Sequence, residues 1–436
     1  MKLDRRVFIR ESREYAYGTH PPYYPDRTYP EILRVFGNDK DNNNSVYGAV
    51  RSLFLDAGFN TSHIGYDSWN PLGDFIKPGM KVVIKPNFVR HYGDLEPDPT
   101  CLITHGSVIR VVTDYVFLAL KDKGSIVIVD APQDDADFEI LAAKTGLKEL
   151  KEYYAQEFGF NLEYYDLRQY ETRKMKGVVI EKRTLPGDPH GYKIVDLGDH
   201  SLLSEMGERS SSFYGADYDV EELRTHHRHG KHEYCIARTI LEADVIINLP
   251  KMKTHKKVGV TLSMKNLVGI NGDKNYLPHY TLGPPITGGD QFSDNSFISL
   301  LEHYLLRYYK IFFKGRLKLS QNIGVPMKLA GERVFGGTDT RKIRSGNWHG
   351  NDTIWRTVLD LNRILLFCDK DGLMKNEPQR GYLSIVDGVI AGEGNGPLGC
   401  RSKSTGILVQ CNNNILTIVD SYDIIHVCGN HPSHWL

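Results

Sequence analysis

Lysine side chains gather in one segment of this 436-residue chain, next to apolar residues that mark an interior. Residues 250–269 contain five lysines and one histidine, and they follow the apolar run 245–247. A buried ammonium group is costly unless it meets an opposite charge. These lysines therefore either face solvent or surround an anionic guest.

The spacing within this segment favours a buried anion site. If residues 257–269 form a helix, Thr261 and Lys265 share one stripe, because residues four apart lie on the same helix face. Apolar residues take most other directions, which is typical of a buried helix. Lys251 and Lys253 would then lie between a strand end and a helix N-terminus, where backbone N–H groups favour phosphate or carboxylate. The alternative is a solvated basic loop followed by an ordinary core helix.

Histidines give candidates for proton transfer and for metal binding. The lysines around His255 would lower its pKa and keep the ring neutral near pH 7, so His255 is the acid–base candidate. His105 stands at a predicted helix start, where a capping role is more common than a catalytic one. Residues 225–232 contain four histidines, but a polar loop with a glycine does not by itself fix zinc ligands.

A glycine-rich stretch near the end of the chain offers oxygen ligands for a cation. Residues 387–397 combine glycines, which permit close backbone approach, with Asp387, Glu393 and Asn395. Asp387 and Glu393 are the predicted ligands of a divalent metal such as Mg²⁺. A tight structural turn is the alternative.

Short apolar runs alternate with helical spacing along the chain, which predicts an α/β fold. Continuous apolar strands are typical of a mostly parallel sheet with helices on both faces. Strands are predicted near residues 81–85, 126–129, 162–166, 244–249, 382–386 and 406–409, and helices near 46–58, 104–121, 137–157, 233–243 and 353–367.

Three of the predicted strands end in polar residues. Lys85 and Asn87 follow the first, Asp130 ends the second, and Lys251 follows the strand at 244–249. Ligands bind at the carboxyl ends of parallel strands. The sequence therefore predicts that these side chains share one site.

The chain divides by composition into a predicted N-terminal cap, residues 1–78, and an α/β domain, residues 79–436, with a helical insertion at 284–345. Within the insertion, residues 297–319 are aromatic and basic at helical spacing. Membrane-surface attachment is one use of such a helix. Packing onto the body or onto a second subunit is more common, so a membrane partner is not expected and a homo-oligomer is left open.

Composition excludes several classes of function. Lys+Arg and Asp+Glu balance at 54 each, so the chain lacks the positive field that non-specific nucleic-acid binding requires. The six cysteines form no C-x-x-C pair, which excludes an iron–sulfur cluster of the usual spacing. The first residues are charged, and no run approaches the roughly 20 apolar residues that span a bilayer. A cytoplasmic protein is expected.

Several segments resemble the DUF362 family, a domain of unknown function. The combination of Pro-Lys-x-Lys-Thr-His at 250–255 with Lys-Asn-Leu-x-Gly at 265–269 is specific, and the order of motifs matches over roughly residues 79–420. Some members carry a ferredoxin-like module, for which this chain lacks the cysteines, so the resemblance is to a branch without it, associated loosely with glycan metabolism. The sequence departs from the family pattern after residue 409, so no role is assigned to Asp420.

The leading hypothesis is an enzyme acting on an anionic small molecule, phosphorylated or carboxylated, by metal-assisted group transfer or isomerisation. His255 and Lys265 are the predicted catalytic residues, with Asp387 and Glu393 holding the metal. The alternative is a non-catalytic protein that binds an anion or a nucleotide, with membrane association through residues 297–319 as one form of it. The predicted substrate-binding residues are Lys85, Asn87, Lys251, Lys253, Thr254, Thr261, Asn266 and Asn395.

Overall fold

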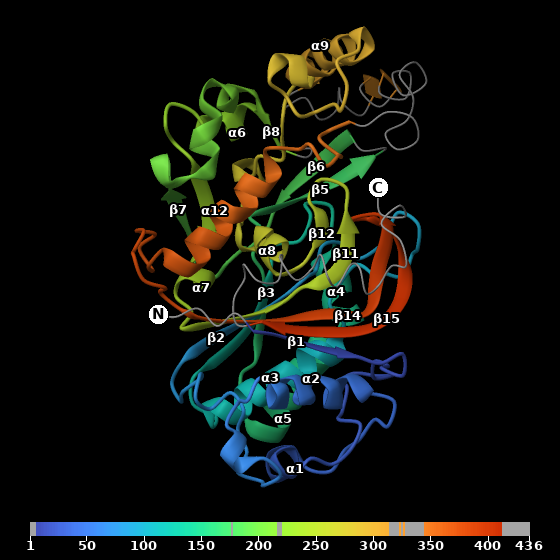
Figure 1. The fold of residues 1–436 in the computed structure, drawn as a ribbon, viewed down its shortest axis with the longest axis vertical. Coiled ribbons are helices and arrows are strands. Elements are labelled where there is room, and N and C mark those ends of the chain that lie inside the picture. The colour runs from blue at the N-terminus through green and yellow to red at the C-terminus, as the bar shows by residue number, and fades with distance from the viewer. Residues whose placement is uncertain are drawn as a thin grey trace.

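The computed structural model describes residues 6–175, 178–215, 220–313 and 344–411, together with residues 322–323 and 326–327. Its centre is a nine-stranded sheet, in which seven strands follow the order β1-β15-β14-β10-β2-β3-β4 and β11 and β12 extend one side (Figure 1). The strands are β1 (Val7–Glu11), β2 (Lys81–Pro86), β3 (Ser125–Asp130), β4 (Glu163–Asp166), β10 (Val245–Leu249), β11 (Lys251–His255), β12 (Gly259–Thr261), β14 (Gly381–Asn395) and β15 (Gly399–Cys411).

The predicted mostly parallel α/β sheet is confirmed. β14, β10, β2, β3 and β4 run parallel to one another. The antiparallel part is the long β14–β15 hairpin and β1, which pairs antiparallel with β15. Five parallel strands in a row bring five carboxyl ends to one edge of the sheet.

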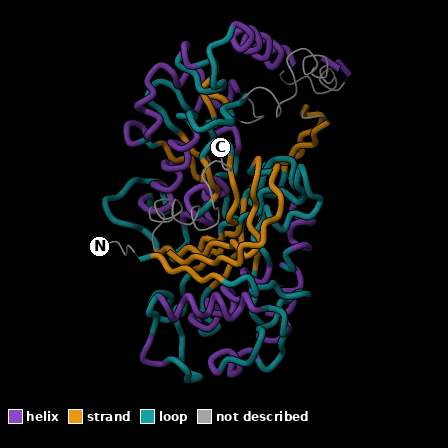
Figure 2. The backbone as a smooth tube through the Cα atoms, turned by 45° about the vertical axis from the view of Figure 1, so that its right-hand side comes forward, coloured by secondary structure: helices purple, strands orange, loops and turns teal. Residues whose placement is uncertain are grey.

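Helices cover both faces of the sheet, as Figures 1 and 2 show. Below the sheet in Figure 1 lie α1 (Pro30–Phe36), α2 (Ser45–Asp56), α3 (Gly106–Leu120) and α5 (Leu147–Phe158). Above it lie α7 (Arg238–Leu241), α8 (Ser263–Asn266), α12 (Ile354–Phe367), α6 (Val220–His226) and α9 (Phe297–Phe313). Smaller strand pairs complete the upper half: β5 (Tyr170–Met175) with β6 (Val178–Thr184), β7 (Tyr192–Asp196) with β9 (Glu233–Ala237), and β8 (Phe213–Tyr214) with β13 (Tyr280–Thr281).

Alternation along the central strands explains why both faces are apolar. Val82 and Ile84 of β2 pack in one hydrophobic cluster, whereas Val83 between them packs in the other. Val245 and Ile247 of β10 likewise face the first cluster. Successive strand residues point to opposite faces, so a strand buried on both sides is a continuous apolar run.

The N-terminal residues share the main sheet and core. β1 forms the edge strand next to β15, and α2 packs against α3. The domain boundary at residue 78 stays a prediction. Much of the predicted insertion at 284–345 lies outside the described residues, apart from the loop after β13, α9 and the residues from 344 onward. None of the helices in the described ranges is both long and apolar enough to cross a membrane.

The structure differs from the sequence analysis in four segments. Residues 257–269 are a hairpin followed by the single turn α8 and a 3-10 turn, because Gly259 at φ 77° and β-branched neighbours favour a turn into a strand. Residues 233–243 are β9 followed by α7, and the predicted helix at 137–157 is α4 (Phe138–Lys144) and α5, separated at Gly146. The glycine-rich stretch from Asp387 is the continuation of β14, paired with β15, and the chain turns only after Asn395.

Candidate functional site

The carboxyl ends of β10, β2 and β3 lie side by side, as predicted from their polar residues. β2 lies between β10 and β3, and Lys85 of β2 is in register with Asn248 of β10. After Pro250 the chain continues beside the same neighbour, because β10 pairs with the first part of β14 and β11 pairs with its second half. Lys251 and Lys253 therefore lie beyond the carboxyl end of β10.

Lys85 is fully buried and paired with a carboxylate. Its Nζ lies 2.7 Å from Asp130 Oδ1 at the end of β3, and the other oxygen of Asp130 accepts from the backbone N–H of Phe88 at 2.7 Å. Burial lowers the pKa of Lys85, while Asp130 opposes that shift. Gly269 packs against the pair: a Cβ there would lie 1.9 Å from Asp130 Oδ1. Only glycine fits at this point of the 265–269 motif.

Lys251 is the second lysine with a buried counter-charge. Its Nζ donates to Asp387 Oδ2 at 3.0 Å and to the hydroxyl of Tyr17 at 2.9 Å. Tyr17 in turn donates to Asp387 Oδ1 at 2.6 Å, and the backbone N–H of His105 donates to Asp387 Oδ2 at 2.9 Å. The Tyr17 ring stacks on the His105 imidazole, with 3.9 Å between ring centroids. Asp387 is therefore fully occupied in holding Lys251.

Three further lysines lack a carboxylate partner within the described part of the chain. Lys253 Nζ donates to the carbonyl oxygen of Leu102 at 2.6 Å, and Lys274 Nζ donates to that of Ala131 at 2.8 Å. Lys265 forms no hydrogen bond with a described residue and is partly exposed. Burial lowers the pKa of Lys253 to about 7 and those of Lys265 and Lys274 to about 8.

These cationic groups lie close enough to influence one another. Lys265 lowers the pKa of Lys253, and Lys85 lowers those of Lys265 and Lys274. The imidazole of His255 has a pKa well below its ordinary value, first through burial and then through Lys265 and other cations around it. The lysines that act on His255, namely Lys265, Lys257 and Lys253, all come from the segment 250–269.

His255 has a defined tautomer. Its Nδ1 accepts from the backbone N–H of Lys257 at 3.2 Å, which leaves the proton of the neutral ring on Nε2. Burial and the nearby Lys265 and Lys257 also lower the pKa of His279 to about 3. Both rings are neutral near pH 7, and His255 offers an N–H donor.

Threonines on the β11–β12 hairpin differ in their roles. Thr261 is opposite Lys253 in the hairpin, and its buried Oγ1 has no hydrogen-bond partner among the described residues. A buried hydroxyl without a partner is costly and calls for an explanation such as a ligand. Thr254 Oγ1 instead donates to the carbonyl oxygen of Gly394 at 2.8 Å, so it ties β11 to β14.

The predicted asparagines hold backbone segments rather than pointing to open space. Asn266 donates to Asn248 Oδ1 at 2.7 Å and to the carbonyl oxygen of Lys85 at 3.2 Å, which fixes the turn that carries Lys265. Asn87 Oδ1 accepts from the backbone N–H of Val89 at 3.3 Å. Asn395 is exposed at the far end of β14.

The structure does not bring the two predicted metal ligands together. Asp387 and Glu393 are six residues apart on one extended strand, which separates them by roughly 20 Å. Asp387 pairs with Lys251, whereas the half-exposed Glu393 pairs with Lys403 at 2.9 Å. Among the described residues, no group of three or more His, Cys, Asp or Glu side chains is arranged to hold a metal ion. These residues do not fit a shared divalent cation.

Sequence reasoning placed Asp130 at the shared site as a strand end but gave it no role, and it missed Lys274 and Tyr17. Lys274 follows the lysine segment, and the residues around it gave no reason to select it. Tyr17 is far away in the sequence and gave no signal. His105 was assigned to capping, and its Nδ1 does accept from the backbone N–H of Ser107 at the start of α3.

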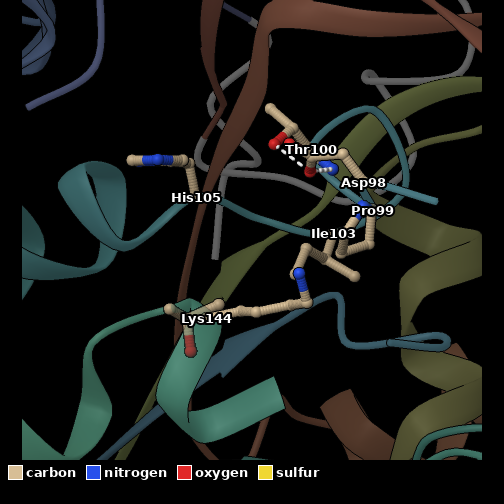
Figure 3. A pocket seen from close by; sticks show the side chains of 7 residues that line it. Asp98, Pro99, Thr100, Ile103, His105 and Lys144 are labelled. Carbon is tan, nitrogen blue, oxygen red and sulfur yellow. Dashed lines mark hydrogen bonds between the residues drawn. The ribbon is translucent and has the colours of Figure 1, made fainter. Parts of the chain in front are cut away.

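His105 also lines a small pocket (Figure 3). Asp98 accepts hydrogen bonds from Thr100, and the Lys144 side chain extends from the end of α4 toward their loop. Burial lowers the pKa of His105 to about 4. The pocket is lined by Asp98, Pro99, Thr100, Ile103, His105, Lys144 and Thr145.

Comparisons with known proteins give a family and one distant structural likeness. A family model described as "Domain of unknown function (DUF362)" matches residues 179–419, more than half of the chain. No curated protein matches the sequence. A crystal structure of a protein from Thermotoga maritima, a structural genomics target, is 10% identical with a TM-score of 0.28, and the match covers 77% of this chain and 52% of that one. This chain thus aligns with about half the length of that protein.

Proposed function

This chain belongs to the DUF362 family, and from that premise we propose that it is an enzyme that binds a phosphorylated or carboxylated small molecule and moves a proton on it. The observation that carries the proposal is the set of three lysines, the buried Lys253 and Lys274 and the partly exposed Lys265, that form no ion pair with a carboxylate among the described residues. An anionic guest would offset the cost of burying them.

The donors around these lysines suit an oxyanion. Lys265 is partly exposed and lies next to His255, whose Nε2–H is a donor. The Oγ1 of Thr261 is buried without a hydrogen-bond partner in the described part of the chain, and Thr261 lies across the hairpin from Lys253. In the proposal, Lys253, His255 and Thr261 bind the anionic group of the substrate.

Lys265 is the proposed proton-transfer residue. With a pKa of about 8, a fraction of its side chains near pH 7 is the free amine, which can accept a proton from the substrate. Removal of a proton and its return at another atom is an isomerisation, and removal from an attacking hydroxyl is the first step of group transfer. His255 is reassigned from proton transfer to hydrogen bonding, because its Nδ1 already accepts from Lys257 N.

The second candidate is non-catalytic binding of the same class of anion. The occupied Nδ1 of His255 favours it, because a binding protein needs donors but no base. The two candidates differ in what Lys265 does: a base must exchange protons with its substrate, whereas a pure binding residue need not.

Calorimetric titration with sodium sulfate tests the shared claim. Lys253→Met and Lys265→Met should each weaken sulfate binding at least about tenfold, since each removes one charge-assisted contact. Lys123→Met, at an exposed position, is the matched control and should bind as the wild type does. Unchanged affinity in both site variants would refute the anion site.

Mass spectrometry of the small molecule that co-purifies with the protein separates catalysis from binding. When that molecule is incubated with enzyme in D₂O, the wild type should incorporate deuterium and Lys265→Met should not. A molecule that binds tightly and is returned unlabelled and unchanged by the wild type supports the binding protein instead.

A further inference from the structure

Two histidines outside the anion site have buried ring nitrogens without a hydrogen-bond partner. His227, which follows α6, is fully buried, and His232, which precedes β9, is 3% exposed. The Nδ1 atom of each ring is buried and has no partner among the described residues. The two rings lie close together, with 5.7 Å between their centroids. A buried polar atom without a partner is costly and calls for an explanation, such as a bound ion.

The tautomer of His227 leaves a lone pair on its Nδ1. The Nε2 atom lies 3.0 Å from the carbonyl oxygen of Tyr276, which can only accept, so the ring proton is on Nε2. Burial lowers the pKa of His227 to about 3, so the ring is neutral near pH 7. Histidines that bind metals have this arrangement, in which one nitrogen donates to a carbonyl oxygen and the other holds the metal.

Aromatic residues pack around His227. The rings of Phe213 and Tyr234 meet the imidazole edge-on, at centroid distances of 6.2 and 5.5 Å, and both residues are fully buried. The hydroxyl of Tyr234 donates to Asp360 Oδ2 at 2.8 Å, so it does not donate to the imidazole. An apolar shell of this kind limits the access of water to a metal site.

The fold separates His227 and His232 from the other two histidines between residues 225 and 232. His226 Nδ1 lies 2.9 Å from Glu233 Oε2, and its ring stacks on Tyr276 with 3.6 Å between centroids. His229 is exposed. The sequence alone did not fix any ligands in this stretch, and the structure selects two of its four histidines.

His232 is held in place by an acidic neighbour. Its backbone N–H donates to Asp196 Oδ1 at 2.9 Å. Burial lowers the pKa of His232, and Asp196 and Asp199 oppose that shift. Negative charge therefore lies near enough to the pair to offset part of the charge of a bound cation.

We propose that His227 and His232 bind one monovalent copper ion through their Nδ1 atoms. Imidazole suits late first-row metals, including copper and zinc. Two rings bound to one ion at about 2.0 Å hold their centroids roughly 5–6 Å apart, which agrees with the observed separation. The described residues contain no group of three or more His, Cys, Asp or Glu side chains arranged around a metal.

The small number of ligands favours Cu⁺ over Zn²⁺. Structural zinc takes four ligands, whereas Cu⁺ forms stable complexes with two nitrogen ligands in line. A single charge also costs less to bury than a double charge. The proposal therefore commits to copper, and zinc serves as the comparison.

Titration of the full chain with Cu⁺, against a colorimetric chelator and without oxygen, tests the proposal. The wild type should bind one Cu⁺ per chain, and X-ray absorption should show two nitrogen neighbours. His232→Phe and His227→Leu should each weaken binding at least about hundredfold, because loss of an outer partner alone can cost that much. His229→Asn, in the same loop, is the matched control and should bind as the wild type does.

Each other outcome overturns the proposal. Wild-type affinity in both His232→Phe and His227→Leu would exclude the pair as ligands. A sulfur neighbour in the X-ray absorption spectrum would place the ion on a cysteine. If Zn²⁺ binds and Cu⁺ does not, further ligands complete the site, and if neither ion binds, water is the occupant. Melting temperatures of the metal-free variants show whether each is folded, and either variant that folds decides the question.

Discussion

Lysines of the same site differ in what surrounds each ammonium group. Lys85 and Lys251 have buried carboxylates at 2.7 and 3.0 Å, so their charges are balanced in the free protein. Lys253 and Lys274 donate to carbonyl oxygens, and none of Lys253, Lys265 and Lys274 forms an ion pair with a carboxylate among the described residues, although Asp130 raises the pKa of Lys274. The balanced pair holds the strand ends together, and the unbalanced three are available to a ligand.

The pKa values of the unbalanced lysines predict how anion affinity changes with pH. Lys265 titrates at about 8 and Lys253 at about 7, and only their protonated forms attract an anion. Affinity for sulfate should therefore rise at least about tenfold as pH falls from about 9 to about 7. Sulfate is the probe because its own charge is constant in this range, and calorimetry in buffers of different ionisation enthalpy measures the accompanying proton uptake. Affinity that is flat or falls toward pH 7 would contradict the assignment.

Stability of the ligand-free protein should depend on pH through Lys253. Its pKa is about 7 when folded and ordinary, near 10.5, when unfolded, so between these values the unfolded chain binds the extra proton. Stability is then lost as pH falls from about 10 to about 7. Lys253→Met should remove up to about 1.4 kcal/mol per pH unit from this slope, measured by urea unfolding.

Lys123→Met is the control for that slope. It removes a lysine that is exposed, so the pH dependence should match that of the wild type. The groups that act on Lys253 are Cys400, Lys265, Cys101 and Lys251, and none of them is changed by either variant. An identical slope in Lys253→Met and the wild type would show that Lys253 titrates normally.

Asp387 is predicted to matter for stability as the counter-charge of Lys251. Asp387→Asn should cost about 3–5 kcal/mol in the free energy of unfolding, because it leaves a buried ammonium group without its anion. The double variant Lys251→Met/Asp387→Asn should recover part of this loss. Denaturant titration measures both, and a single variant as stable as the wild type would argue against a charged pair.

At the scale of elements, close packing of one turn against the sheet makes Gly269 a sensitive position. A methyl group at residue 269 would overlap Asp130 Oδ1 and approach Lys85 Nζ to 2.7 Å. Gly269→Ala should separate this ion pair, lower the melting temperature and weaken sulfate binding. Gly37→Ala is the control for loss of a glycine, since a Cβ there meets nothing within 4 Å, although its φ of 75° adds some strain. If Gly269→Ala and Gly37→Ala lower the melting temperature equally, the loss of stability comes from the backbone and not from the Lys85–Asp130 ion pair.

The elements that sequence predicted well are those with a strong local pattern. β2, β3 and β10 are short apolar runs that end in polar residues, and the sequence placed their ends at one site. The helix predicted over 257–269 failed because its apolar residues suit a hairpin equally well, and pairing with β14 decides between the two. Short apolar runs do not distinguish helix from strand by periodicity alone.

At the scale of the whole molecule, β1 covers an edge of the sheet. A chain beginning at residue 13 should be less stable than the full chain and more prone to associate, because β15 would present unpaired backbone groups along residues 407–411. Thermal unfolding and size-exclusion chromatography measure the two effects. A truncated chain that stays monomeric at wild-type melting temperature would show that β1 adds little.

Long-range contacts explain why part of the site was not predictable. Tyr17 donates a hydrogen bond to Asp387, although the two residues lie far apart in the sequence. No local motif around Tyr17 indicates that contact. The metal prediction brought Asp387 and Glu393 together within a glycine-rich stretch, whereas the pairing of β14 with β15 extends the chain between them. The sequence showed the lysines near the strand ends, but it did not show which side chains pair with them.

Synthesis from the N-terminus to the C-terminus delays the contacts that fix β1. Val7 pairs with Cys411 and Tyr17 bonds to Asp387, so both must wait until nearly all of the described chain has left the ribosome. At roughly 5–20 residues per second, that delay is on the order of tens of seconds. Lys251 emerges well before Asp387, so the nascent chain carries an unmatched cation and an open strand edge during translation. The first described strand, β1, can therefore be fixed only by the last described strand, β15, and the incomplete chain exposes a strand edge until β15 has been made.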